Sequence, residues 1–465
     1  MRLRFCGAAR TVTGSKHLLE LDSGHKILMD CGLFQGRRAD SDRMNRSFLF
    51  DPKEIDVVLL SHAHIDHAGL LPKLWKEGFR GRIYATHATY SLSTLLLLDS
   101  AHIQEKDVRF INKLNRRRGH APVAPLYERR HAEGVLEHFV GVGYRQPFEP
   151  VPGVSVEYRD AGHILGSATM VLTITEGGKT KRLGFTGDVG NPGRPILRDP
   201  QAMQDCDWLI CESTYGGQTH EPGDRAKKAL QEVIERTAAR GGRVIIPAFA
   251  VGRTQEIVYA LDQLWNEGHL RHVPVFVDSP LAVNATSVFL AHPECFDAEL
   301  HEYMLTDDNP WGFDRLTYVR DVEKSKALNG NRVPMVILSA SGMCEAGRIL
   351  HHLRNNIGDD RNTVMMVGYC ADHTLGKRII EKRPEVRIFG EMHRLRAEVS
   401  VMNSFSAHAD EPGILDFVGK LDQDRLQNIF LVHGAPKRQD AMAEAFRGAG
   451  YGNVQIPEFG ETVRL

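Results

Sequence analysis

The stretch His62-Ala63-His64-Ile65-Asp66-His67 places three imidazoles and one carboxylate within six residues. It follows residues 55–60, which are apolar except for Asp56 and predict a buried strand. It precedes residues 69–74, which have the pattern of a helix start. We therefore expect these polar groups on a turn at the carboxyl end of a strand, the edge where layered α/β proteins bind ligands.

Imidazoles and carboxylates are the ligands that zinc and similar divalent ions prefer. His62 and His64 are two residues apart, so in an extended turn both can face one ion. Asp66 and His67 fall on the next bend and can serve a second ion. A polar turn with incidental histidines is the alternative. So many donors directly after an apolar strand favour a metal site.

Size and composition limit the class of protein. A chain of 465 residues is too long for one ordinary core, so two domains are expected. The net charge of -1 excludes a global basic field, so any binding of nucleic acid needs local positive charge. The seven cysteines are scattered without a CxxC pair, which indicates a reducing compartment. The sequence lacks a signal-peptide pattern and any apolar run of membrane-span length, so we expect a soluble cytoplasmic protein with no membrane partner.

Other candidate residues follow predicted strands elsewhere in the chain. Residues 1–60 are expected to be mainly strands, with a hairpin turn at residues 22–25. His408 precedes a predicted helix, whose start Asp410 suits. Each of five further residues stands directly after a predicted strand or at its end: Asp30, His163, Asp188, Glu212 and His433.

The middle of the chain has a different pattern. Residues 68–145 are expected to be mainly helical, with basic stretches at 115–120 and 129–131. These stretches fit either a solvated helical face or a wall that follows phosphates. From residue 214 onward strands and helices alternate, which predicts a parallel sheet in a second α/β unit. Residues 396–465 return to the first pattern, so the second unit is predicted to be an insertion.

Together these motifs resemble the β-CASP branch of the metallo-β-lactamase superfamily, which includes the endonuclease subunit of the eukaryotic mRNA 3′-end cleavage complex. The resemblance covers nearly the whole chain. It implies a metallo-β-lactamase αββα sandwich, residues 1–213 and 396–465, with an inserted β-CASP α/β domain, residues 214–395, whose parallel sheet is flanked by helices. The motifs that carry it are the histidine turn, Glu212, residues 247–256, 339–343 and 368–376, Phe405-Ser406-Ala407-His408-Ala409-Asp410 and Val432-His433-Gly434.

The resemblance also implies roles for individual residues, with two Zn²⁺ per chain and Mn²⁺ as the alternative metal. Asp188 bridges the two ions, and Asp30 supports the metal turn from behind. Asp66, Glu212 and His408 are the catalytic residues, with Glu212 and His408 paired near the scissile phosphate. The first ion has the ligands His62, His64 and His163, and the second has Asp66, His67 and His433. The predicted contacts to substrate phosphates are Arg253, Ser341, Gly342 and Thr374.

The function that this resemblance implies is a metal-dependent ribonuclease that hydrolyses single-stranded RNA in RNA processing or decay. A hydroxide activated by two zinc ions attacks the phosphodiester, and His408 is the general acid. Endonuclease action is expected, and 5′→3′ exonuclease action and a homodimer are left open. The alternatives are a DNA nuclease of the same family, a small-molecule metallo-hydrolase and a catalytically silent RNA-binding subunit. The chain departs from the family pattern at Ala435, Cys370 and His373, which affects substrate handling more than metal binding.

Overall fold

The computed structural model describes residues 1–36, 38–220, 226–368, 370, 373–402 and 406–465, which form two compact units. The first unit contains residues 1–192, 199–219 and 408–465, and the second contains residues 193–198 and 220–407. Residues 369, 371–372 and 405 of the predicted motifs lie outside the described residues. Within the described part of the chain, no helix has both the length and the apolar character that crossing a membrane requires.

The first unit contains two mixed sheets of seven strands each. In the first sheet, in the order β22-β1-β2-β3-β4-β5-β6, the strands from β3 to β6 are parallel. The predicted hairpin at residues 22–25 is confirmed, because it joins the antiparallel strands β2 and β3. The strands of this sheet are β1 (Arg2–Phe5), β2 (His17–Glu20), β3 (Lys26–Met29), β4 (Val57–Leu59), β5 (Arg82–Thr86), β6 (Phe139–Val142) and β22 (Thr462–Arg464).

The second sheet has the order β21-β20-β11-β10-β9-β8-β7. Strands β10, β11 and β20 are parallel neighbours, so their carboxyl ends meet at one edge of the sheet. The remaining pairs from β10 to β7 are antiparallel. The strands of this sheet are β7 (Phe148–Val151), β8 (Val154–Asp160), β9 (Ala168–Glu176), β10 (Lys179–Phe185), β11 (Trp208–Glu212), β20 (Asn428–Val432) and β21 (Val454–Gln455).

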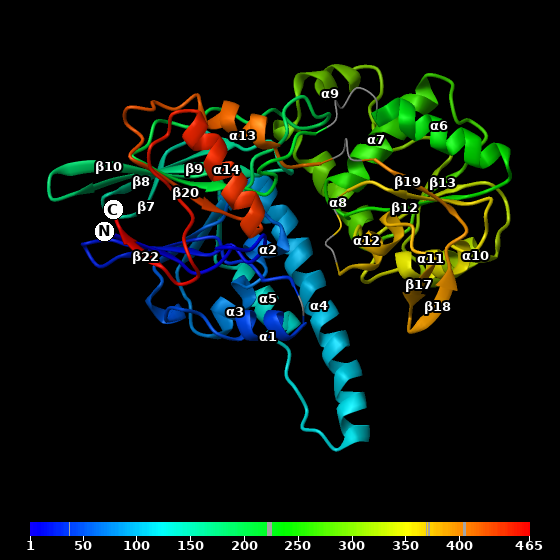
Figure 1. The fold of residues 1–465 in the computed structure, drawn as a ribbon, viewed down its shortest axis with the longest axis horizontal. Coiled ribbons are helices and arrows are strands. Elements are labelled where there is room, and N and C mark those ends of the chain that lie inside the picture. The colour runs from blue at the N-terminus through cyan, green and yellow to red at the C-terminus, as the bar shows by residue number, and fades with distance from the viewer. Residues whose placement is uncertain (37, 221–225, 369, 371–372, 403–405) are drawn as a thin grey trace. The chain divides into compact units, whose positions relative to one another are not determined.

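Helices cover the outer face of each sheet, as Figure 1 shows for the first unit. The inner core is shared by both sheets and includes Phe5, Tyr158 and Phe185. A second apolar cluster lies between the first sheet and its helices, and a third lies between the second sheet and α13 and α14. The predicted αββα sandwich is therefore confirmed. Its helices are α2 (Ile65–Ala68), α3 (Leu71–Lys76), α4 (His87–Arg118), α5 (Arg129–Leu136), α13 (Glu411–Val418) and α14 (Pro436–Gly448).

Two expectations about secondary structure were wrong in part. Residues 1–60 include helix α1 (Arg38–Arg46) and the 3-10 helix η1 (Pro52–Glu54). The sequence of α1 is strongly polar, so it has no apolar stripe that would predict a helix. Residues 68–145 include the strands β5 and β6. These strands are only five and four residues long, too short for an alternating pattern to stand out beside a helix of 32 residues.

The second unit is built on a six-stranded sheet, in the order β14-β13-β15-β12-β16-β19, in which every pair is parallel. This confirms the parallel sheet predicted for the insertion. Its strands are β12 (Val244–Pro247), β13 (Val275–Val277), β14 (Leu316–Tyr318), β15 (Val336–Ser339), β16 (Thr363–Met366) and β19 (Glu398–Val401), and β17 (Glu385–Ile388) and β18 (Glu391–Arg394) form a separate hairpin. Its helices are α6 (Ala226–Ala239), α7 (Arg253–Asn266), α8 (Pro280–Ala291), η3 (Pro293–Cys295), α9 (Ala298–Tyr303), α10 (Val322–Gly330), α11 (Ile349–Asn356) and α12 (Leu375–Ile380).

Strand β19 pairs with β16, so residues 398–401 belong to the sheet of the second unit. The predicted domain bounds at 213/214 and 395/396 stay a prediction.

Candidate metal centre

The histidine turn lies where the sequence predicts it, after β4 and at the start of α2. Asp66 and His67 are on α2 itself, so one helical turn presents both side chains. The loop after β3 packs against this turn, since Cys31 N donates to His67 O at 2.7 Å. A Cβ atom at Gly32 would lie 1.6 Å from Asp66 O, so only glycine allows the two segments to approach this closely.

The other candidate residues come from the second sheet and the loops beside it. His163 follows β8, Asp188 follows β10, Glu212 ends β11 and His433 follows β20. His408 lies just before α13. The structure therefore brings together, in the first unit alone, residues that are far apart in the chain, such as His67 and His433, which are 366 positions apart.

Backbone contacts hold the loops of these residues together. Gly190 N donates to Ala161 O at 2.7 Å, and Ala409 N donates to Val189 O at 2.8 Å. A Cβ atom at Gly190 would lie 1.9 Å from Gly162 O. The loops that carry His163, Asp188 and His408 are thus in direct contact, which fixes their side chains relative to one another.

The first group of donors consists of His62, His64, His163 and Asp188. His64 Nδ1 lies 3.1 Å from His62 Nε2 and 3.2 Å from His163 Nε2. Asp188 Oδ2 lies 3.4 Å from His62 Nε2 and 3.5 Å from His163 Nε2. Ligands about 2.0–2.1 Å from a tetrahedral zinc ion lie roughly 3.3–3.4 Å from one another. The spacing of these four atoms therefore fits a zinc ion.

The second group consists of Asp66, His67 and His433. His433 Nε2 lies 3.2 Å from His67 Nε2 and 3.5 Å from Asp66 Oδ2. Asp188 Oδ2 is 3.3 Å from His67 Nε2, so one carboxylate oxygen approaches both groups. Asp188 Oδ1 is buried and makes no hydrogen bond among the described residues, and it lies 3.6 Å from His433 Nδ1. A buried carboxylate oxygen without a partner is costly unless a cation compensates it, so these residues fit a metal centre.

The charge state of the first group suits metal binding. Burial holds the pKa of His62 and of His163 well below the usual value and lowers the pKa of His64 to about 4. These imidazoles are therefore neutral near pH 7, and a neutral imidazole is the form that binds a metal. Burial opposes ionisation of Asp66, but the neighbouring His433 and His67 hold its pKa well below the usual range.

Asp30 lies behind the histidine turn and is completely buried. Its Oδ2 accepts hydrogen bonds from His67 Nδ1 at 2.7 Å and Ser15 Oγ at 3.0 Å, and its Oδ1 accepts one from Ser61 N at 2.8 Å. With the proton on Nδ1, His67 directs the lone pair of Nε2 toward the other donors. Burial works against protonation of His67, but Asp188 and Asp30 raise its pKa well above the usual value, so a metal ion bound at Nε2 would replace a proton there.

Two hydroxyl groups that contact the candidate ligands were not predicted. Ser61 Oγ lies 3.0 Å from His62 Nδ1, and Thr214 Oγ1 lies 3.0 Å from His433 Nδ1. Ser61 could have been found from its position directly before the histidine turn. Thr214 carries no such signal, because only the fold brings it to His433.

Glu212 and His408 form the predicted hydrogen-bonded pair. His408 Nδ1 lies 3.0 and 3.2 Å from the two carboxylate oxygens of Glu212. Glu212 Oε1 also accepts a hydrogen bond from Val189 N at 2.7 Å, which fixes the carboxylate. His408 Nε2 lies 3.9 Å from Asp188 Oδ2, on the side of the candidate metal ligands. Burial opposes protonation of His408, but Glu212 and Asp188 raise its pKa to about 9.

The four residues predicted to contact phosphate lie in the second unit. Ser341 and Gly342 follow β15, Arg253 starts α7 after β12, and Thr374 caps α12 after β16. Because β15, β12 and β16 are adjacent parallel strands, the four residues lie at one edge of that sheet. Arg253 is buried and forms an ion pair with Glu256. The role of these residues as phosphate contacts stays a prediction.

The structure describes the surroundings of the three residues that depart from the family pattern, which are Cys370, His373 and Ala435. Cys370 is buried, and its Sγ lies 3.7 Å from Gly342 O. A Cβ atom at Gly376 would lie 2.6 Å from this sulfur, so the thiol fills the space beside the glycine. Ala435 occupies the N-cap position of α14 and makes no side-chain cap, and His373 is exposed. All seven cysteines of the chain are free thiols.

Comparison with known families accounts for almost the whole chain. Residues 14–247 match the metallo-beta-lactamase superfamily, and residues 254–379 match the Beta-Casp domain. Residues 392–457 match the Zn-dependent metallo-hydrolase RNA specificity domain. The chain therefore belongs to the β-CASP family of RNA-processing nucleases within the metallo-β-lactamase superfamily, as its motifs predict. It is an enzyme of the zinc-dependent metallo-hydrolase class.

Individual relatives support this assignment. The chain is 38% identical over 466 residues to ribonuclease TTHA0252 of Thermus thermophilus, and the match covers 100% of both chains. It is 32% identical over 452 residues to transcription termination factor FttA of Methanosarcina mazei, with 94% of this chain and 67% of the relative covered. The FttA protein of Methanocaldococcus jannaschii is 28% identical over 478 residues, with 100% of this chain and 72% of the relative covered.

Proposed function

We propose that this protein is a ribonuclease that hydrolyses phosphodiester bonds of single-stranded RNA at a centre of two zinc ions. One observation carries the proposal, which is that Asp188 Oδ2 lies within 3.5 Å of His62, His67 and His163. This single oxygen therefore approaches both groups of donors, as a ligand that bridges two ions must do. The relative that is named a ribonuclease covers the full chain and supports the choice of RNA.

The two donor groups would supply the ligand sets of two ions. His62, His64 and His163 would hold one ion, and Asp66, His67 and His433 would hold the other, with Asp188 shared. The three imidazoles of the first set favour zinc, while Mn²⁺ is the alternative that carboxylate ligands also accept. Asp30 would keep His67 in the tautomer that presents Nε2 to the ion.

Zinc ions bound by these residues would supply a Lewis acid that lowers the pKa of water and offsets negative charge on a phosphodiester. The protein itself would supply the proton that the leaving 3′-oxygen needs when its bond to phosphorus breaks. His408 is the proposed donor, because its Nε2 points toward the ligands while its Nδ1 is bonded to Glu212. Glu212 would orient the imidazole and stabilise its charged form, held by the amide of Val189.

The phosphates beyond the cleaved bond would be held by the second unit. Ser341 and Gly342 lie at the carboxyl edge of its sheet with Thr374, where backbone N–H groups can donate to phosphate oxygens. Glu256 already contacts the guanidinium group of Arg253, so Arg253 would attract phosphates through its charge at this edge rather than by a direct contact. Exonuclease action from a 5′ end belongs to the same proposal as a second mode of cleavage.

The first experiment removes metal ligands. Asp66→Ala and His163→Ala should each abolish cleavage of a single-stranded RNA and lower the zinc content, with an unchanged circular dichroism spectrum. Lys53→Ala is the matched control, because Lys53 is an exposed residue of the first unit outside the ligand sets. A ligand variant that cleaves RNA at the wild-type rate would refute the assigned centre.

The second experiment tests the general acid. His408→Ala should slow turnover by about 10²–10⁴-fold, the usual contribution of a positioned acid, with zinc content unchanged. Glu212 is the hydrogen-bond partner of His408, and Glu212→Gln keeps the shape of this side chain but removes its charge. This variant should also lower kcat. If His408→Ala instead loses zinc, the residue is a ligand, in agreement with its place in a third donor group with Asp188 and Glu212.

The third experiment tests the substrate. RNA and DNA oligomers of the same sequence, offered separately, should show cleavage of RNA only. A protein that cuts both equally, or DNA alone, would favour the DNA nuclease alternative. Mapping the products from 5′-monophosphorylated and 5′-triphosphorylated RNA separates the two modes, because only exonuclease action depends on the 5′ end.

A further inference from the structure

Helix α4 begins beside the metal centre and ends far from it. Thr89 Oγ1, in its first turn, donates to Gly166 O at 2.8 Å, in the loop that carries His163. The last buried residue of the helix is Ala101, and every later residue is at least partly exposed. In Figure 1 the cyan end of α4 extends away from the rest of the first unit. At about 1.5 Å per residue, Arg117 lies roughly 42 Å along the helix from Thr89.

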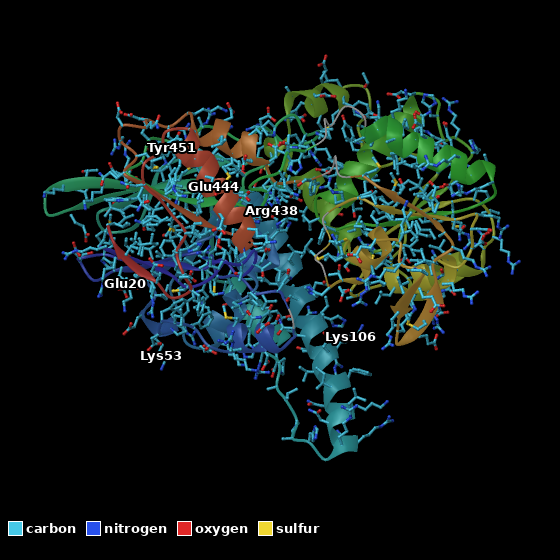
Figure 2. All side chains as sticks on the ribbon, in the orientation of Figure 1. Glu20, Lys53, Lys106, Arg438, Glu444 and Tyr451 are labelled. Carbon is cyan, nitrogen blue, oxygen red and sulfur yellow. The ribbon has the colours of Figure 1, made fainter. Side chains whose placement is uncertain are left out.

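The exposed end of α4 is strongly basic. Residues 106–118 contain six Lys or Arg residues and one Asp, in a chain whose total net charge is -1. Helical spacing places five of the cations on one side of the helix, which we call the α4 basic face. Lys106, labelled in Figure 2, marks the end of this face that is nearest the sandwich. The α4 basic face consists of Lys106, Arg109, Lys113, Arg116 and Arg117, all exposed.

These cations are mostly unneutralised. Arg109 lies 3.9 Å from Glu105. Among the described residues, no carboxylate lies within 4 Å of Lys113, Arg116 or Arg117. Arg109, Lys113, Arg116 and Arg117, with Asn112, line a shallow hollow on the surface. A concentrated positive charge of this kind attracts a polyanion.

An aromatic ring accompanies the cations. Phe110 is 63% exposed, and helical spacing places it beside Lys106 and Lys113. Proteins that bind single-stranded nucleic acids combine cations for the phosphates with exposed aromatic rings on which bases stack. The returning chain lies along the other side of the helix, since Asn115 Nδ2 donates to Ala121 O at 3.1 Å. The α4 basic face is therefore the side that remains open to a ligand.

We propose that the α4 basic face binds the RNA strand at a distance from the cleavage site, with Phe110 stacking on a base. The inference rests on the proposed ribonuclease function and adds a second contact region to it. A second copy of this chain is a poorer fit, because two such faces would repel each other. The exposed apolar groups beside them, Ile103 and Phe110, are also few for an interface that needs about 800 Å² from each partner.

The test compares a long and a short RNA with the zinc-loaded full chain. At the 3.4 Å spacing of phosphates along a stacked strand, 42 Å corresponds to about 12 nucleotides. An unstructured RNA of about 30 nucleotides can reach the α4 basic face, whereas one of about 6 cannot. The variant Lys113→Glu/Arg116→Glu/Arg117→Glu should raise KM for the long RNA by about 10- to 100-fold at about 0.1 M salt, with kcat unchanged. KM for the short RNA should stay the same.

Salt dependence identifies the kind of contact that is lost. If the three cations contact phosphates, the slope of log KM against log salt concentration should fall by about 2 in the variant, at about 0.7 for each contact. Phe110→Ala should raise KM for the long RNA by about 5-fold or more without changing this slope, because stacking releases no counterions. The control variant Lys53→Glu/Arg82→Glu/Lys179→Glu changes the net charge equally at exposed positions of the first unit and should leave KM unchanged.

Three results would overturn the inference. The triple variant could cleave the long RNA with the KM of the wild type. The control variant could raise KM as much as the triple variant does, which would show a general effect of net charge. Phe110→Ala could convert a dimer to a monomer in light scattering with KM unchanged, which would make this face an interface between copies. A wild type that cleaves neither RNA would instead refute the proposed function, and this inference with it.

Discussion

The replacement Asp30→Asn tests whether a buried carboxylate behind the ligands controls the affinity for zinc. Asparagine has the same shape as aspartate and tolerates the left-handed backbone found here, where φ is 58°. The substitution therefore removes the charge that faces His67 Nδ1 at 2.7 Å and leaves the backbone unstrained. Hydrogen bonds to a charged group contribute about 1.5–3 kcal/mol. This range agrees with the loss of about 10- to 100-fold in metal affinity that is typical when such a partner of a ligand is replaced.

The assay is a competition for zinc between the protein and a chromogenic chelator, with the unfolding free energy measured in parallel. Asp278→Asn is the matched control, because Asp278 is also a buried carboxylate bonded to a histidine, His352 Nε2 at 2.6 Å, but lies in the second unit. We expect both variants to lose about 3–5 kcal/mol of stability, since each breaks a buried charged pair. Only Asp30→Asn should bind zinc more weakly. Zinc affinity equal to that of the wild type in Asp30→Asn would refute the role given to Asp30.

Two further predictions concern stability. Gly32→Ala should lower the unfolding free energy by about 1–3 kcal/mol and weaken zinc binding, because the new Cβ would displace the backbone at Asp66. Gly448→Ala is the control, because its new Cβ meets no atom within 4 Å, and it should be neutral or slightly stabilising. Burial opposes ionisation of Asp278, but His352 and neighbouring donors hold the pKa of its carboxyl group below the usual value. The stabilising contribution of the Asp278 carboxylate to the unfolding free energy should therefore be complete above the unfolded pKa, about 3.9. This contribution should be lost as the pH falls through the lower folded pKa. Urea unfolding between about pH 7 and pH 3 should show that the difference in unfolding free energy between the wild type and Asp278→Asn becomes smaller as the pH falls. A difference that does not change with pH would contradict this.

The candidate ligands could be predicted because metal ligands in this fold stand at strand ends. Short apolar runs show where strands end, and the sequence then gives the residue that follows, as it does for His163, Asp188 and His433. Parallel pairing of β10, β11 and β20 brings these ends to one edge of a sheet. Two strands of the first sheet, β5 and β6, were missed because short strands beside long helices leave little pattern.

Other features depend on the fold and leave no mark in the sequence. Thr214 reaches His433 across 219 positions of the chain. The backbone of His433 has φ of 52°, a conformation that no local motif predicts for a histidine. Arg253 was expected to face phosphate, and only the structure reveals that Glu256 already contacts it. Such pairings arise from tertiary contacts, which spacing along the sequence does not record.

The central claim is that two metal ions lie side by side in the first unit and share Asp188. The most direct test is an anomalous difference map at the zinc edge from crystals grown with zinc. The account predicts two peaks, one bonded to His62, His64 and His163 and the other to Asp66, His67 and His433. A single peak, or peaks away from these residues, would contradict it.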